Sequence, residues 1–261
     1  MTSLPKKLEG KVAIVTASTE GIGYAVAKRL AEDGASVMIS SRRQKKVDEA
    51  VAKLKSENLT NVKGVVCHAG KEDHRNYLIE ETLRSFGGID MLVCNAASNP
   101  SPGPFFDTTE EAWDKVFHVN LKSAFLLIKA VIPYMEKRGG GSIVTVSSVV
   151  AHRTDAVPGV HASAYGISKI SLIGLTKALV PECAAKNIRI NCMSPGVIET
   201  RFSEVIWKNS FANKNAMALI PMKRLGQSSE CAGVVSFLCS DDSSYISGET
   251  IIVGGGMSCR L

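Results

Sequence analysis

The sequence predicts an α/β protein in which one seven-stranded parallel sheet is covered by helices on both faces, within a single domain of residues 1–261. Three observations support this prediction. The apolar pattern switches repeatedly between short β-rich runs and longer helical segments, which is typical of βαβ units. With 261 residues, of which 45% are apolar and 21% charged, the chain can bury one large core. No composition break, linker or fixed-period repeat marks a second domain.

The individual elements follow from the local sequence in chain order. Short runs rich in β-branched residues and bounded by Gly, Asn or Ser predict strands at residues 12–16, 36–40, 62–67, 91–95, 142–147, 188–193 and 250–253. Apolar residues three and four apart predict helices at residues 22–33, 44–57, 73–86, 110–137 and 164–186. Two stretches break this rhythm and predict irregular surface: residues 99–106, with three prolines, and the long apolar connection 200–224.

Charge and composition exclude several classes of protein. The net charge is +6, from 31 basic and 25 acidic residues, but the basic residues are scattered, which argues against a nucleic-acid partner and suits an anionic small molecule. No apolar window approaches eighteen uncharged residues, and the first ten residues carry charges, which argues against membrane spans and a secretory signal. Seven cysteines without paired short spacing predict reduced thiols in a soluble intracellular protein without a metal site.

A turn of small residues, 16–23, follows the first predicted strand and opens directly into a helix. Gly21 and Gly23 allow close backbone approach in this turn. The free N–H groups and the positive dipole end of a helix N-terminus attract anions, so this context predicts a pyrophosphate site. The alternative is an ordinary strand-to-helix turn that contains glycine.

The second predicted strand ends near Ser41, Arg42 and Arg43, where a dinucleotide fold places the adenosine ribose. An acidic residue there would accept a hydrogen bond from the ribose 2′-hydroxyl and favour NAD, whereas hydroxyls followed by arginines suit a 2′-phosphate. We therefore expect NADP(H) as the cofactor. The alternative assigns both arginines to a solvated helix start.

Tyr165 and Lys169 are four residues apart in a predicted helix and therefore share one face. A neighbouring cation favours the phenolate and makes the phenol a usable acid or base at neutral pH, although most such pairs are structural. Ser147 and Ser148 end the fifth predicted strand, at the sheet edge where ligands bind in open α/β folds. A hydroxyl at that edge can bind a substrate carbonyl oxygen.

Taken together, the glycine turn, Ser148, Tyr165 and Lys169 resemble the pattern of the short-chain dehydrogenase/reductase family over nearly the whole chain, and Asn120 matches its catalytic asparagine. The resemblance implies a doubly wound Rossmann fold, in which Tyr165 protonates a carbonyl oxygen that Ser148 orients, while the nicotinamide gives hydride to the carbon. It implies that Lys169 bonds the nicotinamide ribose and lowers the pKa of the tyrosine. Asn120 would secure a water that links Lys169 to solvent.

Two further segments match family sites for the cofactor. Residues 94–97 resemble the strand end Asn-Asn-Ala-Gly, and residues 195–200 resemble the Pro-Gly-x-x-x-Thr segment that holds the nicotinamide carboxamide. The cofactor-binding residues that the resemblance implies are Thr16, Ser18, Thr19, Gly21, Ile22, Gly23, Ser41, Arg42, Arg43, His68, Asn95, Ala96, Ala97, Tyr165, Lys169, Pro195, Gly196, Ile198 and Thr200.

Three single positions depart from the family pattern. Ala17 replaces the first glycine of the turn motif, which tightens the turn by one methyl group, and we expect cofactor binding to survive. Ala97 stands where the strand-end motif has glycine. His68 occupies the place of the aspartate that meets the adenine, where a histidine can stack on the base or use its backbone.

The interval between Ser148 and Tyr165 is a few residues longer than is usual in the family, and it contains Pro158, Gly159 and His161. We expect it to reshape the substrate mouth, and it leaves Ser147 as an alternative to Ser148. The apolar stretch 202–222 predicts a lid over an apolar substrate. The alternatives for this stretch are an oligomer contact and simple packing on the domain.

Within the family, the segments 16–19, 40–42, 66–68, 136–141, 231–233 and 253–256 resemble a branch of peroxisomal NADPH-dependent carbonyl and retinal reductases. This likeness implies retinal, aromatic ketones and α-dicarbonyls as substrates, and a homotetramer formed through the helices at 110–137 and 164–186. The last three residues, Cys259, Arg260 and Leu261, resemble a Ser-Lys-Leu-type address for a peroxisomal import receptor. The alternatives are a chance match and a cytosolic pool.

Other functions remain open on the same fold. A catalytically weak NADP(H) sensor or scaffold has no use for the set Asn120, Ser148, Tyr165 and Lys169, which argues against it. A dehydrogenase that acts on a steroid or another alcohol would use the same residues. A sugar-nucleotide epimerase or dehydratase usually carries an additional C-terminal substrate domain, whereas this sequence ends soon after its last predicted strand.

Overall fold

The structure is a computed structural model and describes residues 6–100, 103–153 and 163–257. Its centre is a parallel sheet of seven strands in the order β3-β2-β1-β4-β5-β6-β7, which confirms the predicted fold class. The strands are β1 (Val12–Val15), β2 (Ser36–Ser41), β3 (Val62–Val66), β4 (Met91–Cys94), β5 (Gly141–Val146), β6 (Ile188–Pro195) and β7 (Thr250–Val253). Strand order reverses between β1 and β4, and ligands bind at such switch points in open α/β sheets.

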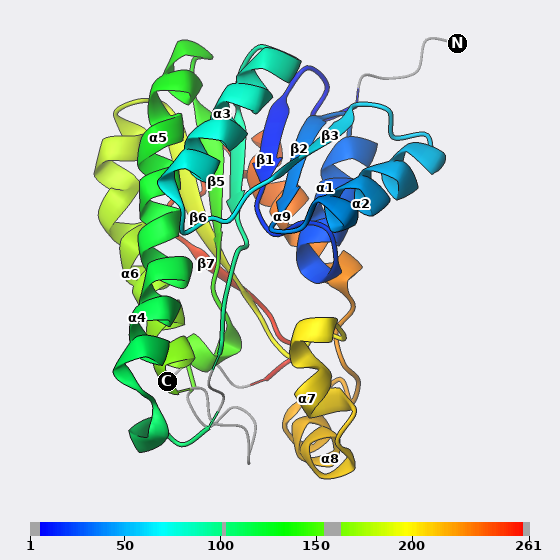
Figure 1. The fold of residues 1–261 in the computed structure, drawn as a ribbon, viewed down its shortest axis with the longest axis vertical. Helices are drawn as coiled ribbons and strands as arrows, with labels where there is room; N and C mark the ends of the chain where they lie inside the picture. Colours follow the sequence, from blue (N-terminus) through cyan, green and yellow to red (C-terminus); the bar gives the residue numbers. More distant parts are fainter. Residues whose placement is uncertain (1–5, 101–102, 154–162, 258–261) are drawn as a thin grey trace.

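Helices cover both faces of the sheet (Figure 1). One face carries α1 (Gly21–Glu32), α2 (Gln44–Ser56) and α9 (Ser228–Cys239), and their apolar sides share one core with that face. The other face carries α3 (Glu72–Phe86), α4 (Glu110–Phe117), α5 (Ser123–Lys137) and α6 (Ser163–Ala184), over a second core. Because the central strands are buried on both faces, they read as continuous apolar runs without polar alternation.

The predicted helix at residues 110–137 is continuous in the chain but changes its winding in the middle. A π-helical turn, His118–Lys122, separates α4 from α5 and contains the buried Asn120. Such turns occur frequently at functional sites. By length and hydropathy Glu110–Lys137 is apolar enough to cross a membrane. Its apolarity has a simpler cause here, since the inner side of α5 supplies Leu127, Ile128 and Val131 to the core.

The connection after β6 is helical, which corrects the prediction of an irregular surface for residues 200–224. It contains α7 (Glu204–Trp207) and α8 (Ser210–Leu219), which lie beyond the carboxyl ends of the strands (Figure 1). Asn209 caps α8 through a hydrogen bond from the Ala212 N–H, at 2.9 Å, and Trp207 Nε1 donates to the Thr200 carbonyl at 2.8 Å. We call residues 200–225 the α7–α8 segment. A parallel bridge between Ile198 and Gly226 joins its two ends.

Two more local differences concern the connections. Residues 99–106 were predicted to form irregular surface. Residues 101–102 lie outside the described part of the chain, and the end of the stretch enters a 3₁₀ turn, Phe105–Asp107. Helix α9 was not among the segments predicted from apolar spacing. It begins with a capping box in which the Gln227 and Glu230 side chains satisfy backbone groups, and its apolar residues pack on α1.

Candidate active site

A cavity of about 430 Å³ lies at the carboxyl ends of the strands, between the sheet and the α7–α8 segment. It extends from the end of β2, past the turn between β1 and α1, to Tyr165 and Lys169 on α6. Every residue predicted to hold the cofactor lines this cavity except Ser18. The buried core beneath it, together with the ends of β1, β4, β5 and β6, fixes where these side chains stand.

The turn between β1 and α1 forms one wall of the cavity and depends on two glycines. Gly21 has a φ of +58° and Ala17 a φ of +50°, so the alanine adopts the left-handed conformation that favours glycine. A Cβ at Gly23 would meet the Ala17 carbonyl oxygen and would stand 2.9 Å from the Ser18 Cα. The turn therefore tolerates Ala17, at a small conformational cost, while Gly23 admits no side chain.

Ser18 stabilises this turn from inside the protein and does not reach the cavity. Its hydroxyl donates to the Val15 carbonyl and accepts from the Ser40 N–H at 2.9 Å, and its own N–H donates to the Ser40 carbonyl at 2.9 Å. The side chain is completely buried. Its polar groups are thus used in joining β1 to β2, which places Ser18 beneath the proposed cofactor site.

Thr16 and Asn95 connect the ends of β1 and β4 at the switch point of the sheet. The Thr16 hydroxyl accepts from the Asn95 and Ala96 N–H groups, both at 3.0 Å. The Asn95 amide donates to the carbonyls of Thr16 at 3.1 Å and Ala17 at 3.0 Å. These bonds hold the turn against β4, so both residues position the cavity wall as well as lining it.

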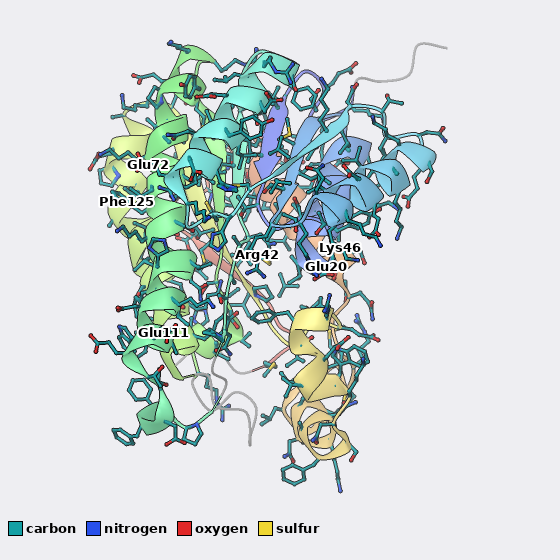
Figure 2. The ribbon with its side chains drawn as sticks, in the orientation of Figure 1. Glu20, Arg42, Lys46, Glu72, Glu111 and Phe125 are labelled. Carbon is teal, nitrogen blue, oxygen red and sulfur yellow. The ribbon has the colours of Figure 1, made fainter. Side chains whose placement is uncertain are left out.

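Cations gather where the cavity meets the end of β2. Ser41, Arg42 and Arg43 line it there together with Lys46, a residue that the sequence analysis did not single out. Lys46 lies in the first turn of α2, and its place in the basic run that begins at Arg42 was the available signal. Figure 2 labels Arg42, Lys46 and Glu20 near the middle of the molecule, and all three line the cavity. In the described part of the chain no ion pair joins Arg42 or Arg43 to a carboxylate.

His68 lines the cavity next to this cationic end. Its Nδ1 accepts a hydrogen bond from the Gly70 N–H at 3.1 Å, so the proton of the neutral ring is assigned to Nε2. Burial lowers the pKa of His68, and the positive charge of Arg42 lowers it further. The ring therefore offers a neutral N–H donor where the family pattern has an acidic acceptor.

Tyr165 and Lys169 meet at the other end of the cavity. The Lys169 ammonium lies 5.5 Å from the centre of the Tyr165 ring and donates to the Val146 carbonyl at 2.7 Å. Lys169 is almost completely buried, and this burial lowers its pKa to about 8. Burial raises the pKa of Tyr165, while a hydrogen bond with Ser148 opposes that rise. The phenol accordingly keeps its proton at neutral pH.

The two serines at the end of β5 have different surroundings. Ser147 is buried, and its hydroxyl donates to the Lys169 carbonyl at 2.7 Å, so it joins β5 to α6. Both serines line the cavity, but Ser148 hydrogen-bonds Tyr165, and its hydroxyl accepts a long hydrogen bond of 3.4 Å from the Val150 N–H. Of the two hydroxyls, the one on Ser148 is placed beside the phenol.

Asn120 lies directly behind this end of the cavity. Its Oδ1 accepts from the Ser98 N–H at 2.7 Å, and its Nδ2 donates to the Ser98 carbonyl at 3.1 Å and to the Ser168 hydroxyl at 2.9 Å. It is buried and does not line the cavity. Asn120 thus connects the π-helical turn, the strand-end loop after β4 and α6, which carries Tyr165 and Lys169.

Some sequence predictions fall outside the described residues. Pro158, Gly159 and His161 belong to residues 154–162, and Cys259, Arg260 and Leu261 belong to residues 258–261. The six described cysteines are buried free thiols. Within the described ranges, no group of three or more His, Cys, Asp or Glu side chains is placed to hold a metal ion.

A parallel sheet of this order, with a glycine turn at its switch point and a buried Tyr–Lys pair at the same cavity, defines a nucleotide-dependent oxidoreductase. A family model described as enoyl-(acyl carrier protein) reductase matches residues 16–258. Dehydrogenase/reductase SDR family member 4 from Sus scrofa is 52% identical over 256 residues, covering 98% of this chain and 90% of the relative. The mitochondrial member 2 from Homo sapiens is 48% identical, covering 97% of this chain and 88% of the relative.

A solved structure is similar to this chain in both fold and sequence. A 7α-hydroxysteroid dehydrogenase, complexed with NADH and 7-oxo glycochenodeoxycholic acid, is 30% identical with a TM-score of 0.90, covering 98% of each chain. This chain belongs to the short-chain dehydrogenase/reductase family and is an oxidoreductase.

Proposed function

We propose that this enzyme reduces ketones and aldehydes with NADPH and that Tyr165 donates the proton. The observation that carries the proposal is a single cavity with Arg42, Arg43 and Lys46 at one end and Ser148, Tyr165 and Lys169 at the other. A dinucleotide with a 2′-phosphate needs cations at its adenosine end and an acid/base group at its nicotinamide end.

The residues of the cavity fit that cofactor. The turn at Gly21 and Gly23 leaves backbone N–H groups free at the start of α1, which suits a pyrophosphate. The segment from Pro195 to Thr200 would hold the carboxamide, as the family resemblance implies, and His68 would meet the adenine. When bound, the reduced nicotinamide supplies the hydride.

The chain's own groups then supply binding, orientation and the proton. Ser148 hydrogen-bonds the substrate carbonyl oxygen beside Tyr165, whose phenol, protonated at neutral pH, donates the proton. Lys169 places a buried positive charge near the phenol and favours the phenolate that remains after proton transfer. Asn120 positions α6 through Ser168, and by family resemblance it holds a water that returns the proton from solvent.

The substrate side of the cavity is apolar. Phe202, Val205 and Ile206 of the α7–α8 segment line it, and the Phe202 ring lies 5.7 Å from that of Tyr165. We propose that this segment acts as a lid and that the substrates are apolar carbonyls such as retinal, aromatic ketones and α-dicarbonyls. A steroid alcohol or ketone is the second candidate, favoured by the similarity to the 7α-hydroxysteroid dehydrogenase structure.

Cofactor oxidation with purified enzyme tests the activity. NADPH is supplied with all-trans-retinal, an aromatic ketone, an α-dicarbonyl and a ketosteroid, and Tyr165→Phe is compared with Tyr77→Phe, a matched change on the outer side of α3. We expect turnover in the wild type and in Tyr77→Phe, and loss of turnover in Tyr165→Phe. If no carbonyl is turned over while NADPH still binds, the sensor or scaffold alternative replaces the reductase.

Cofactor choice is tested separately at Arg42. Replacing it with alanine should weaken NADPH binding by about 10- to 100-fold, because a charge-assisted phosphate contact is lost, and leave NADH binding within about twofold. Both dissociation constants are measured by cofactor fluorescence. An equal loss for the two cofactors would remove Arg42 from the 2′-phosphate site.

The cellular setting follows from the same resemblance. We propose a homotetramer formed through the α4–α5 and α6 helices, whose outer side carries the partly exposed Phe125 and Ile170 (Figure 2 labels Phe125). We also propose import into peroxisomes through Cys259, Arg260 and Leu261, with a cytosolic pool. Light scattering of the purified protein, and imaging of a variant without the last three residues, test these two points.

A further inference from the structure

An ion pair joins the turn that precedes α1 to the α7–α8 segment beside the cavity. The Arg201 guanidinium lies 3.8 Å from a Glu20 carboxylate oxygen, and both residues line the cavity. The residues adjacent to the pair also approach each other, because a Cβ at Gly21 would stand 3.3 Å from Thr200 Cγ2. Figure 2 shows Glu20 at the end of α1 that faces α7.

Glu20 is an unusual residue for its place. It is the N-cap of α1, yet its side chain makes no capping hydrogen bond to the helix. Because the Glu20 carboxylate does not cap the helix, the first N–H groups of α1 are left to bind an anion. The negative charge of the same carboxylate, however, repels an incoming phosphate. The carboxylate therefore needs a counter-charge if the cofactor's pyrophosphate is to bind beside it.

Arg201 is held where it can provide that charge. It begins the 3₁₀ turn Arg201–Ser203, whose preceding residue, Thr200, shares a capping box with Ser203. Trp207 Nε1 donates to the Thr200 carbonyl at 2.8 Å, so the indole fixes the same turn. The guanidinium is thus carried on an anchored piece of backbone, although the Arg201 side chain is 61% exposed.

We propose that Arg201 is a positioning residue for the cofactor: it neutralises Glu20 and thereby keeps the N-terminus of α1 receptive to a dinucleotide pyrophosphate. This inference rests on the proposed function in that the ligand is a nicotinamide dinucleotide. It adds a link between the α7–α8 segment and cofactor affinity, because the segment supplies the counter-charge. Since NADPH and NADH share the pyrophosphate, the effect is the same for both cofactors.

Four variants of the full-length enzyme test the proposal through dissociation constants for NADPH and NADH, measured by cofactor fluorescence without substrate. Arg201→Met should weaken both cofactors by about fivefold at low salt, in line with the loss of one exposed charge pair. Glu20→Gln alone should leave affinity within about twofold. Glu20→Gln combined with Arg201→Met should restore affinity to within about twofold of the wild type.

Lys208→Met is the matched control, because it removes one positive charge from the same segment at a residue that pairs with Glu204 and does not line the cavity. It should leave both affinities unchanged, and the Arg201→Met defect should shrink as salt rises toward 0.5 M. Melting curves establish that each variant is folded.

Failure to restore affinity in the double variant would overturn the proposal, since Arg201 would then act on the cofactor directly or not at all. An equal loss in Lys208→Met would overturn it as well. A wild type that binds neither cofactor would instead refute the proposed function, and the inference with it, so the two failures are distinguishable.

Discussion

Alanine substitutions of the two adjacent serines at the end of β5 should have different effects: Ser148→Ala should lower kcat, and Ser147→Ala should lower stability. Ser148→Ala removes the hydroxyl that stands beside Tyr165 in the cavity, and loss of one oriented donor to a reacting oxygen typically costs a factor of 10² to 10³ in kcat. The stability of Ser148→Ala should barely change, because the hydrogen bond that the Ser148 hydroxyl accepts from the Val150 N–H is long, at 3.4 Å. Ser147→Ala instead removes a buried 2.7 Å bond to the Lys169 carbonyl.

That buried bond is worth about 1 kcal/mol. For a protein of this size, the melting temperature of Ser147→Ala should fall by roughly 2–4 °C. Its kcat should fall by less than about tenfold, because the bond holds α6 but does not touch the substrate.

The assay pairs a melting curve with NADPH oxidation, using the carbonyl that gives the highest wild-type rate. The two variants form a matched set, because each removes one hydroxyl from neighbouring positions of the same strand end. The reasoning is refuted if Ser147→Ala loses 100-fold or more in kcat at an unchanged melting temperature while Ser148→Ala stays active. In that case Ser147 orients the carbonyl.

Three more predictions concern the turn, the lysine and the far edge of the sheet. Gly23→Ala should destabilise the fold by about 1–3 kcal/mol and weaken cofactor binding, because the added Cβ clashes with the backbone of the turn. Gly233→Ala in α9 is the control: its Cβ has room, and it should stabilise the fold by about 1 kcal/mol. Melting curves and cofactor titrations measure both effects. Burial lowers the pKa of Lys169 to about 8, so Lys169 loses its positive charge above that pH. The rate of carbonyl reduction should therefore be constant below pH 8 and fall above pH 8. A rate that stays constant up to pH 10 would contradict this role of Lys169. Asp90→Ala breaks an ion pair with Arg138 at the amino ends of the strands, and the free energy of unfolding from a denaturant titration should fall by about 2 kcal/mol. We expect kcat to stay unchanged, because the cavity lies at the carboxyl ends of the strands. A large loss of kcat in the folded variant would contradict this expectation.

Local patterns predicted most of the fold. All seven strands lie within two residues of the predicted boundaries, because buried parallel strands are continuous β-branched runs between turn residues. The prediction was wrong at residues 200–224, where α7 and α8 are short and depend on contacts outside themselves. Trp207 donates to the Thr200 carbonyl, and Ala216 is buried against Ile220 and Val197 in a small separate core. Apolar spacing within such short segments does not reveal those contacts.

The site was predictable to the extent that its residues carry spacing signals. Tyr165 and Lys169 share a helix face, and the glycine turn follows a strand, so the sequence predicts both features from residue spacing alone. Lys46 and Arg201 were not singled out. Their roles depend on which side of the cavity their helix or turn faces, and residue spacing does not determine that.

Neighbouring residues in the chain were enough to predict the strands in order, most of the helices, the glycine turn and the Tyr165–Lys169 pair, because strand runs, helical periodicity and residue spacing are local properties. The folded structure was needed to show which of two adjacent serines places its hydroxyl beside Tyr165, and that the Ser18 hydroxyl is hydrogen-bonded inside the fold. It also decided that Glu20 and Arg201, 181 positions apart, form a pair. The physical reason is the same in each case: hydrogen bonds and charges act over a few ångströms in space, and only the folded chain brings distant residues within that range.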